Sequence, residues 1–337
     1  MKYLSLFSGI GGFECAIQSS YPSAECVGYS EIDPYAVSIY KKYYPLHVNL
    51  GDITKITNVP ECDLIVAGFP CTNLSSMANV RGNNKGLQGP KSGLFFDLLR
   101  ILSSALQQNS NLKFIIENNN SMSTINKELI TEHLQKLCTV YNIVINNASF
   151  GVQTRKRIIW TNFEVSPPLE SDLVQTWDDV LVPLDSIPKK CIFTEKMTNC
   201  LNKLSAYRNT KGYTKHIVTL PNGLFRLDYI LTTTHKSRWD IQNRSDNMSD
   251  QVYPYPVGKS RPVTTGAGGN NAILDRRIDT SGKNMFFIVR YFTITELERL
   301  FGLSDDYTSG VSDTQRKKVL GNTISVFMVK HVLKFYS

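Results

Sequence analysis

The sequence predicts an α/β fold: a doubly wound, mostly parallel sheet with a second, smaller mixed-β domain. Residues 1–163 alternate strand-like apolar runs with helix-like segments, the pattern of a parallel sheet covered by helices. Ser166-Pro167-Pro168 breaks the alternation, and the sequence to about residue 288 is irregular, with Pro, Gly, Asn and Thr among short β-type runs. We therefore predict a first domain from residues 1–163 plus 289–337, and a second from 164–288.

Two helices can be placed within this outline. Residues 95–107 have helical spacing, which predicts a core face formed by the following residues: Phe96, Leu99, Leu102 and Leu106. Thr293 with Glu296 three positions later resembles a helix-capping box, so a helix is expected over 293–300. The segment 321–335 is expected to return to the first domain.

Composition narrows the class of protein. The 337 residues are 42% hydrophobic, enough for a sizeable core, and the net charge of +8 suits a partner rich in phosphates. Most of the surplus charge lies between residues 165 and 290. The seven cysteines form no Cys-x-x-Cys pair, and no histidine spacing completes a site with Cys191 and Cys200, so neither a disulfide framework nor a bound metal is expected.

The expected location follows from two further features. No run approaches the roughly 18 apolar residues of a membrane span, and the chain enters a strand at once, which leaves no room for a signal peptide. We expect an intracellular protein, cytoplasmic or nucleoid-associated.

A cysteine and a carboxylate follow neighbouring predicted strands. Cys71 comes after Pro70, just beyond the buried-strand pattern 62–69, and Glu117 ends the apolar run 112–116. Ligands of open α/β sheets bind at such strand ends. A thiolate is a strong nucleophile, and a carboxylic acid can protonate ring nitrogen 3 of a pyrimidine and make carbon 6 electrophilic. A buried structural thiol is the alternative for Cys71.

The beginning of the chain predicts a cofactor site. Glycines follow the strand 3–7 in the pattern Gly9-x-Gly11-Gly12, where the backbone can approach a ligand closely. Glu31 should end a second strand, where a carboxylate can bind ribose hydroxyls, and Asp52 could accept from an adenine amino group. A plain tight turn is the alternative. Since no phosphate-binding lysine follows the glycines, S-adenosylmethionine fits better than a nucleotide.

The segment 153–157 places three polar side chains on one face of a strand: Gln153, Arg155 and Arg157. A solvated basic strand is the alternative interpretation.

These motifs together resemble those of DNA (cytosine-5) methyltransferases over nearly the whole chain. The matching segments, in the order of the family, are 7–12, 31–33, 52–53, 70–71, 117–118, 153–157, 261–265 and 321–326. The resemblance implies a methyltransferase fold, S-adenosyl-L-methionine as cofactor, S-adenosyl-L-homocysteine as product, and double-stranded DNA as substrate. It also implies that the irregular segment 164–288 recognises the target sequence.

The resemblance assigns roles residue by residue. The catalytic set is Cys71, Glu117, Arg155 and Arg157, with Arg157 expected to hold ring oxygen 2 and orient Glu117. The expected cofactor contacts are Phe7, Ser8, Gly9, Gly11, Gly12, Glu31, Ile32, Asp52, Ile53, Pro70, Asn322 and Val326. The expected DNA contacts are Ser75, Gln153, Arg208, Arg238, Arg244, Thr264 and Thr265. A monomer is expected, with a restriction endonuclease of the same system as a candidate partner.

The sequence also departs from the family pattern. Phe69 and Thr72 stand beside the nucleophile where the family usually has Pro and Gln, and Asn119 replaces the usual valine after Glu-Asn. None of these changes removes a group that the mechanism needs. The stretch 86–96 is closer to the de novo branch of the family.

Three alternatives remain. A tRNA cytosine methyltransferase shares the catalytic set but usually carries a Cys-Phe-Thr element, which this sequence lacks. A non-catalytic DNA-binding relative would lose Cys71 or Glu117. A nicotinamide dehydrogenase would use the glycine loop but would leave Cys71, Glu117 and the arginines unexplained.

Overall fold

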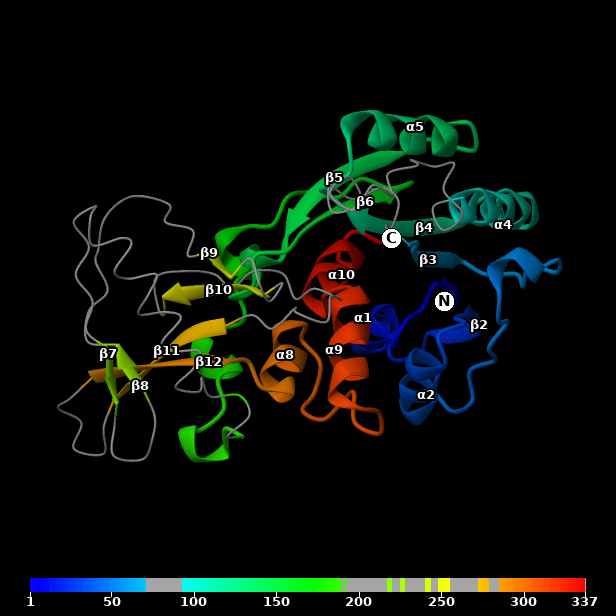
Figure 1. Ribbon diagram of the computed structural model, residues 1–337. Helices are drawn as coiled ribbons and strands as arrows, with labels where there is room; N and C mark the ends of the chain where they lie inside the picture. The colour runs from blue at the N-terminus through cyan, green and yellow to red at the C-terminus, as the bar shows by residue number, and fades with distance from the viewer. Residues whose placement is uncertain are drawn as a thin grey trace.

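The computed structural model describes residues 1–70, 93–188, 191 and 285–336, together with the strands at 217–219, 225–227, 240–243, 248–254 and 272–278. Two six-stranded sheets organise these residues (Figure 1). The first sheet is built from β1 (Lys2–Leu6), β2 (Glu25–Ser30), β3 (Leu64–Gly68), β4 (Lys113–Asn119), β5 (Tyr141–Asn146) and β6 (Lys156–Thr161). The helices around it are α1 (Gly12–Ser20), α2 (Pro34–Tyr43), α4 (Leu94–Gln108), α5 (Thr124–Gln135), α8 (Ile294–Leu300), α9 (Asp313–Asn322) and α10 (Val326–Leu333).

The first sheet has the strand order β2-β1-β3-β4-β6-β5. In it β6 is antiparallel to both β4 and β5, and the other pairs are parallel. The order reverses direction between β1 and β3, the type of position at which open α/β sheets bind ligands. The predicted doubly wound, mostly parallel sheet is therefore confirmed.

Both faces of this sheet are buried, as the apolar strand sequences predict. Along β3, Leu64 faces α1 and α10, whereas Ile65 faces α4 and α5. β4 alternates in the same way at Ile115 and Ile116. Figure 1 shows these helix pairs on opposite sides of the sheet. The sheet is thus the shared wall of two apolar cores.

The core face predicted for the helix at 95–107 is only partly right: Leu102 is buried as predicted, whereas three other buried positions lie one residue before Phe96, Leu99 and Leu106. The residues of α4 that are buried are Phe95, Leu98, Ile101, Leu102 and Ala105, whereas Phe96 is 45% exposed. Phe96 lies on the same side of the helix as Arg100 and Ser103, and this side faces solvent because it is the more polar one. Leu99 and Leu106 flank the buried stripe and are partly buried.

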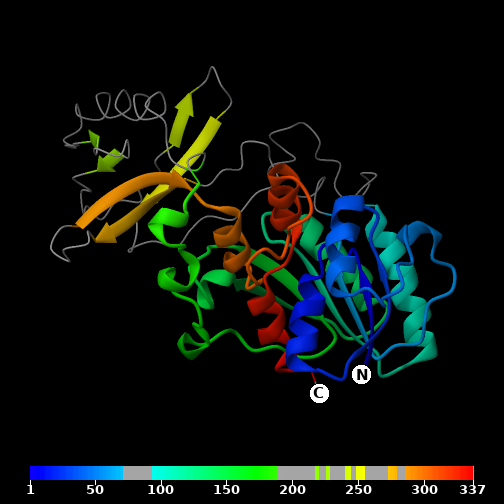
Figure 2. The same cartoon turned by 90° about the horizontal axis from the view of Figure 1, so that it is seen from below.

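The second sheet contains both parallel and antiparallel pairs. Its order is β7-β8-β12-β11-β10-β9, with β10 and β11 parallel and the other pairs antiparallel. Its strands are β7 (Ile217–Thr219), β8 (Phe225–Leu227), β9 (Asp240–Asn243), β10 (Met248–Pro254), β11 (Ala272–Ile278) and β12 (Met285–Tyr291). Figures 1 and 2 both place these strands at one end of the molecule, away from β1 and β2. The domain boundaries at 163/164 and 288/289 stay a prediction.

A buried ion pair marks the passage from β12 into α8. Nη2 of Arg290 lies 2.7 Å from Oε1 of Glu296, and both side chains are fully buried. Glu296 also accepts from the backbone N–H of Thr293, which completes the predicted capping box, and from that of Val182. One carboxylate therefore joins the segment entering the second sheet to the segment leaving it.

Candidate active site

Five strands of the first sheet have an end on the same side of the sheet, which is called here the strand-end edge. The carboxyl ends of the parallel strands β1 to β4 lie there, and antiparallel β6 begins there. The glycine loop, Glu31, Gly68, Glu117 and the segment before Arg157 are therefore brought together, although up to 150 positions separate them in the chain.

The glycine loop, defined as residues 7–12, leaves β1 through unusual backbone conformations. Phe7 has φ 55°, Gly9 φ 56° and Gly11 φ 91°. A bulky residue rarely adopts positive φ, and such conformations cluster at functional sites. The N–H of Gly11 donates to the carbonyl of Ser8 at 3.0 Å, and α1 begins at Gly12.

The carboxylate of Glu31 contacts this loop. Its Oε2 accepts from the N–H of Gly9 at 2.9 Å, and its Oε1 accepts from the N–H groups of Ile32 and Asp33, each at 2.8 Å. A carboxylate has about four lone-pair positions, so capacity remains for ligand hydroxyls. The structure places Glu31 at the glycine loop, and the three backbone bonds explain how it is oriented, while its contact with the cofactor stays a prediction.

Two further predicted cofactor positions flank Glu31. Ile32 leaves 68% of its surface exposed, an apolar face suited to stacking on a base. Oδ1 of Asp52 accepts from the backbone N–H and hydroxyl of Thr54, which lowers the pKa of Asp52. Ile53, the next residue, is buried and supports this turn.

The turn between α9 and α10 closes the other side of the glycine loop. A Cβ at Gly12 would lie 2.7 Å from Oγ1 of Thr323 and 3.1 Å from the carbonyl oxygen of Ile324, so this approach requires glycine. Asn322, at the end of α9, is exposed, whereas Val326 is buried at the start of α10.

Arg155 supports that same turn. Its Nη2 donates to the carbonyls of Gly321 and Thr323, each at 2.9 Å, and its guanidinium lies 5.1 Å from the ring centre of Phe301. These contacts connect the segment before β6 to the turn that lies against the glycine loop.

Glu117 and Arg157 form an ion pair at the strand-end edge, where β4 ends and β6 begins. Nε of Arg157 lies 2.6 Å from Oε1 of Glu117, and both side chains are about nine-tenths buried. A Cβ at Gly68 would lie 3.2 Å from Oε2 of Glu117, so this glycine leaves room for the carboxylate. Burial raises the pKa of Glu117 and outweighs the lowering by Arg157 and Arg155. The site thus favours a protonated Glu117 more than water does.

Asn118 makes a contact that the sequence did not predict. Its side-chain amide donates to the carbonyl of Phe69 at 3.0 Å, and it is almost fully buried. The contact fixes the backbone two residues before Cys71. The available signal was the amide beside Glu117, at the end of the neighbouring strand.

Several predicted residues lie outside the described part of the chain. These are Cys71, Ser75, Arg208, Arg238, Arg244, Thr264 and Thr265. Pro70 is the last described residue before Cys71. Gln153 is described and fully buried, so it does not lie on the surface of this structure, and its contact with DNA stays a prediction.

This geometry agrees with a comparison to known families. A model of the C-5 cytosine-specific DNA methylases matches residues 1–336. The chain belongs to this family. The methylase is accordingly an S-adenosylmethionine-dependent DNA cytosine-5 methyltransferase.

Curated relatives match the methylase over most of its length. Type II methyltransferase M.NgoBV of Neisseria gonorrhoeae is 28% identical, with 98% of this chain and 97% of the relative covered. Type II methyltransferase M.NlaX of Neisseria lactamica is 27% identical, with 98% and 94% covered.

Solved structures share the fold of the methylase. The methyltransferase EhMeth of Entamoeba histolytica has a TM-score of 0.64 at 14% identity, with 99% of this chain and 97% of that chain covered. A mutant of Spodoptera frugiperda DNMT2 has a TM-score of 0.64 at 18% identity, with 99% and 98% covered.

Two features are absent from the described residues of the methylase. No helix among them is long and apolar enough to cross a membrane. No group of three or more His, Cys, Asp or Glu side chains among them is placed to hold a metal ion.

Proposed function

We propose that the methylase flips a cytosine out of duplex DNA and methylates carbon 5 through a covalent bond between Cys71 and carbon 6. Extrusion is needed because the ring carbons cannot be reached inside the stacked duplex. The observation that carries this proposal is the buried Glu117–Arg157 pair at the strand-end edge, next to the Phe69 carbonyl that Asn118 holds.

The proposed steps use groups on neighbouring strand ends. The Cys71 thiolate forms a bond to carbon 6 while protonated Glu117 gives its proton to nitrogen 3, and the electron pair moves to carbon 5. Arg157 donates to ring oxygen 2 and keeps Glu117 in place. After carbon 5 has taken the methyl group, it loses its proton to a base. Cys71 then leaves carbon 6, and nitrogen 3 returns its proton to Glu117.

The raised pKa of Glu117 supports its role as the acid. A general acid works best when its pKa lies near the pH at which it acts. Burial moves the pKa of Glu117 in that direction, and Arg157 prevents the carboxyl group from rotating away.

The residues around the glycine loop fit S-adenosylmethionine, which supplies an electrophilic sulfonium methyl group when bound. Among the described residues, no heavy atom beyond the chain neighbours lies within 4 Å of where a Cβ would sit at Gly9 or Gly51. The carboxylate of Glu31 and the exposed side of Ile32 adjoin this space, matching ribose hydroxyls and an adenine face.

Trapping tests the covalent step. DNA carrying 5-fluorocytosine at the target should form a stable adduct with the enzyme and cofactor, because fluorine at carbon 5 cannot leave as the proton does. Mass spectrometry should map the adduct to Cys71, and Cys71→Ser should form none. An adduct at another residue, or turnover by Cys71→Ser above about a tenth of wild type, would refute this mechanism.

We also propose that residues 164–288 form the target recognition domain. The basic surplus of this segment suits phosphate contacts, while base edges are read by side chains such as Arg, Asn and Gln. Grafting residues 170–285 onto a related enzyme of known target should transfer the target motif. An active chimera that keeps the target of its host would place recognition elsewhere.

The type II names of the relatives support a restriction-modification role for this methylase. DNA from cells that express it should resist a restriction endonuclease of the same target sequence. Sequencing the methylated cytosines in that DNA would identify the target motif. Complete cleavage of fully methylated DNA by the endonuclease would exclude the protective role.

A further inference from the structure

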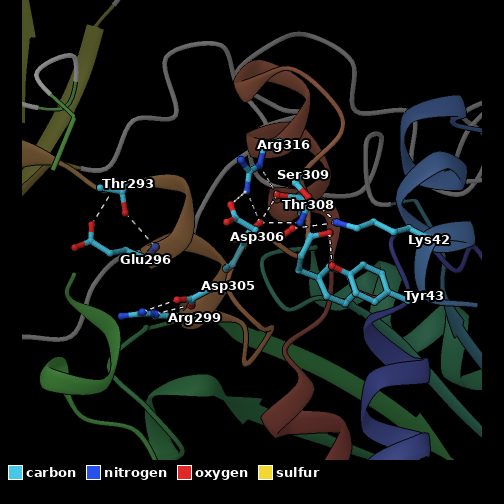
Figure 3. Close-up of polar contacts among 12 residues, drawn as sticks. Lys42, Tyr43, Thr293, Glu296, Arg299, Asp305, Asp306, Thr308, Ser309 and Arg316 are labelled. Carbon is cyan, nitrogen blue, oxygen red and sulfur yellow. Dashed lines mark hydrogen bonds and ion pairs between the residues drawn. The ribbon is translucent and has the colours of Figure 1, made fainter. Parts of the chain in front are cut away.

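The loop between α8 and α9, residues 301–312, is held against α2 beside the cofactor site. Nζ of Lys42 donates to Oγ of Ser309 at 2.5 Å and to the carbonyl of Asp306 at 3.4 Å. The hydroxyl of Tyr43 donates to the carbonyl of Tyr307 at 3.0 Å. Figure 3 shows Lys42 and Tyr43 extending from α2 toward this loop. The end of α2 therefore fixes the backbone around Tyr307.

The side chain of Tyr307 reaches from this loop to the glycine loop. Its ring stacks on that of Tyr43, with centres 4.0 Å apart and planes 3° from parallel, and only 3% of the residue is exposed. Its hydroxyl donates to the carbonyl of Ile10 at 2.8 Å. Ile10 lies between Gly9 and Gly11, the two loop glycines with positive φ.

A chain of hydrogen bonds orients the hydroxyl of Tyr307. The hydroxyl of Tyr44 donates to Sγ of Cys15, and this thiol donates to the hydroxyl of Tyr307, each at 3.4 Å. The proton of Tyr307 is thereby directed at Ile10. Burial raises the pKa of Tyr307, so its hydroxyl remains a donor at neutral pH.

Gly11 allows this close approach. A Cβ there would lie 2.7 Å from Cε2 of Tyr44 and 3.1 Å from the hydroxyl oxygen of Tyr307. The glycine loop and the two tyrosines therefore fit together only because this position has no side chain.

We propose that Tyr307 is a positioning residue for the cofactor: its hydroxyl fixes the Ile10 carbonyl and thereby the backbone conformation of the glycine loop. Glycine torsions are soft, so a loop with glycines on both sides of Ile10 needs an external contact to hold one geometry. The inference rests on the proposed cofactor site at this loop. It adds to that site Tyr307, a residue from near the other end of the chain.

The test compares two tyrosine-to-phenylalanine variants. Tyr307→Phe keeps the stacked ring and removes the bond to Ile10. Tyr21→Phe is the matched control, because the hydroxyl of Tyr21 also joins the first helix to the last segment, at the carbonyls of Leu333 and Tyr336, away from the glycine loop. Calorimetry gives the Kd for S-adenosylmethionine, steady-state kinetics gives KM and kcat, and thermal melting gives Tm.

Loss of a hydrogen bond to a buried carbonyl should raise the Kd and KM for S-adenosylmethionine about five-fold or more in Tyr307→Phe. The effect on KM should exceed that on kcat, and the KM for DNA should not follow it. Tyr21→Phe should lower Tm to a similar extent and leave the Kd within about two-fold. Equal Kd values for the two variants would overturn the inference. Glu31→Ala distinguishes failure of the proposed cofactor site from failure of the role of Tyr307, because unchanged cofactor affinity in that variant would refute the cofactor site itself.

Discussion

Arg157 and Glu117 are diagonal neighbours on adjacent antiparallel strands, not a directly opposed pair. In the register of β4 and β6, Glu117 lies opposite Ile159 and Arg157 lies opposite Asn119, yet Nε of Arg157 is 2.6 Å from Oε1 of Glu117. A diagonal pair of this kind requires a long side chain. Arginine spans the diagonal and places its guanidinium beside the carboxylate.

Glu117→Gln tests the acid. The amide preserves the size of the side chain but has no proton of suitable acidity for nitrogen 3, so kcat should fall by at least about 100-fold. Calorimetry should show an almost unchanged Kd for S-adenosylmethionine, since the carboxylate of Glu117 lies beside Arg157 and Gly68 and the proposed cofactor contacts are with the glycine loop and Glu31. Near-normal turnover would remove Glu117 from the proposed mechanism.

Arg157→Met should change the pH dependence as well as the rate. Arg157 lowers the pKa of Glu117 through its charge and hydrogen bond, so its removal should raise that pKa further. Activity is lost as pH rises through the pKa of the acid, so the alkaline limb of kcat/KM should move to higher pH. Arg157→Lys, which keeps the charge, should show a smaller shift. A limb that moves to lower pH would contradict this assignment.

Glu31→Ala should affect both cofactor affinity and stability. The carboxylate accepts from the N–H groups of Gly9, Ile32 and Asp33, so its loss leaves these donors without their acceptor and removes the proposed ribose contact. The Kd for S-adenosylmethionine should rise by the equivalent of about 1–3 kcal/mol, and Tm should fall. DNA binding, measured by fluorescence anisotropy, serves as the control and should change little.

Glu14→Gln tests a buried carboxyl in the first turn of α1. Its Oε1 accepts from Tyr40, whose hydroxyl lies 3.0 Å from Nδ1 of His47, and burial raises the pKa of Glu14 to about 7. The folded protein therefore binds this proton more tightly than the unfolded chain, and stability falls as pH rises from about 4.5 to 7.

Glutamine mimics the protonated form of Glu14. At pH 8 the variant should be more stable than wild type by up to about 3 kcal/mol, and the gain should disappear near pH 4.5. Urea unfolding at several pH values measures the difference. A gain that does not depend on pH would show that ionisation of Glu14 is not its cause.

Much of the site could be predicted because each polar residue interrupts an apolar strand pattern. Glu31 and Glu117 appear where such runs end, and the parallel topology brings these ends to one edge. The α4 face was mispredicted because Phe96 is apolar on an otherwise polar side, and local spacing alone does not rank two overlapping stripes.

The remaining contacts depend on positions far apart in the chain. Tyr307 meets Ile10 across 297 positions, and Arg155 meets Thr323 across 168. A local sequence pattern cannot predict contacts between residues so far apart in the chain. The sequence placed Arg155 among the catalytic residues, which stays a prediction, and it gave no signal for the contacts of Arg155 with the carbonyls of Gly321 and Thr323.

The glycine loop and its partners also differ in when they are synthesised. A ribosome makes residues 7–12 early, but Tyr307 and Thr323, which hold them, follow the whole of segment 164–288. A nascent chain that has already folded β1 to β6 therefore contains Glu117 and Arg157 without a complete cradle for the methyl donor. The contacts of Tyr307 and Thr323 with the glycine loop therefore form only after the proposed recognition segment has been made.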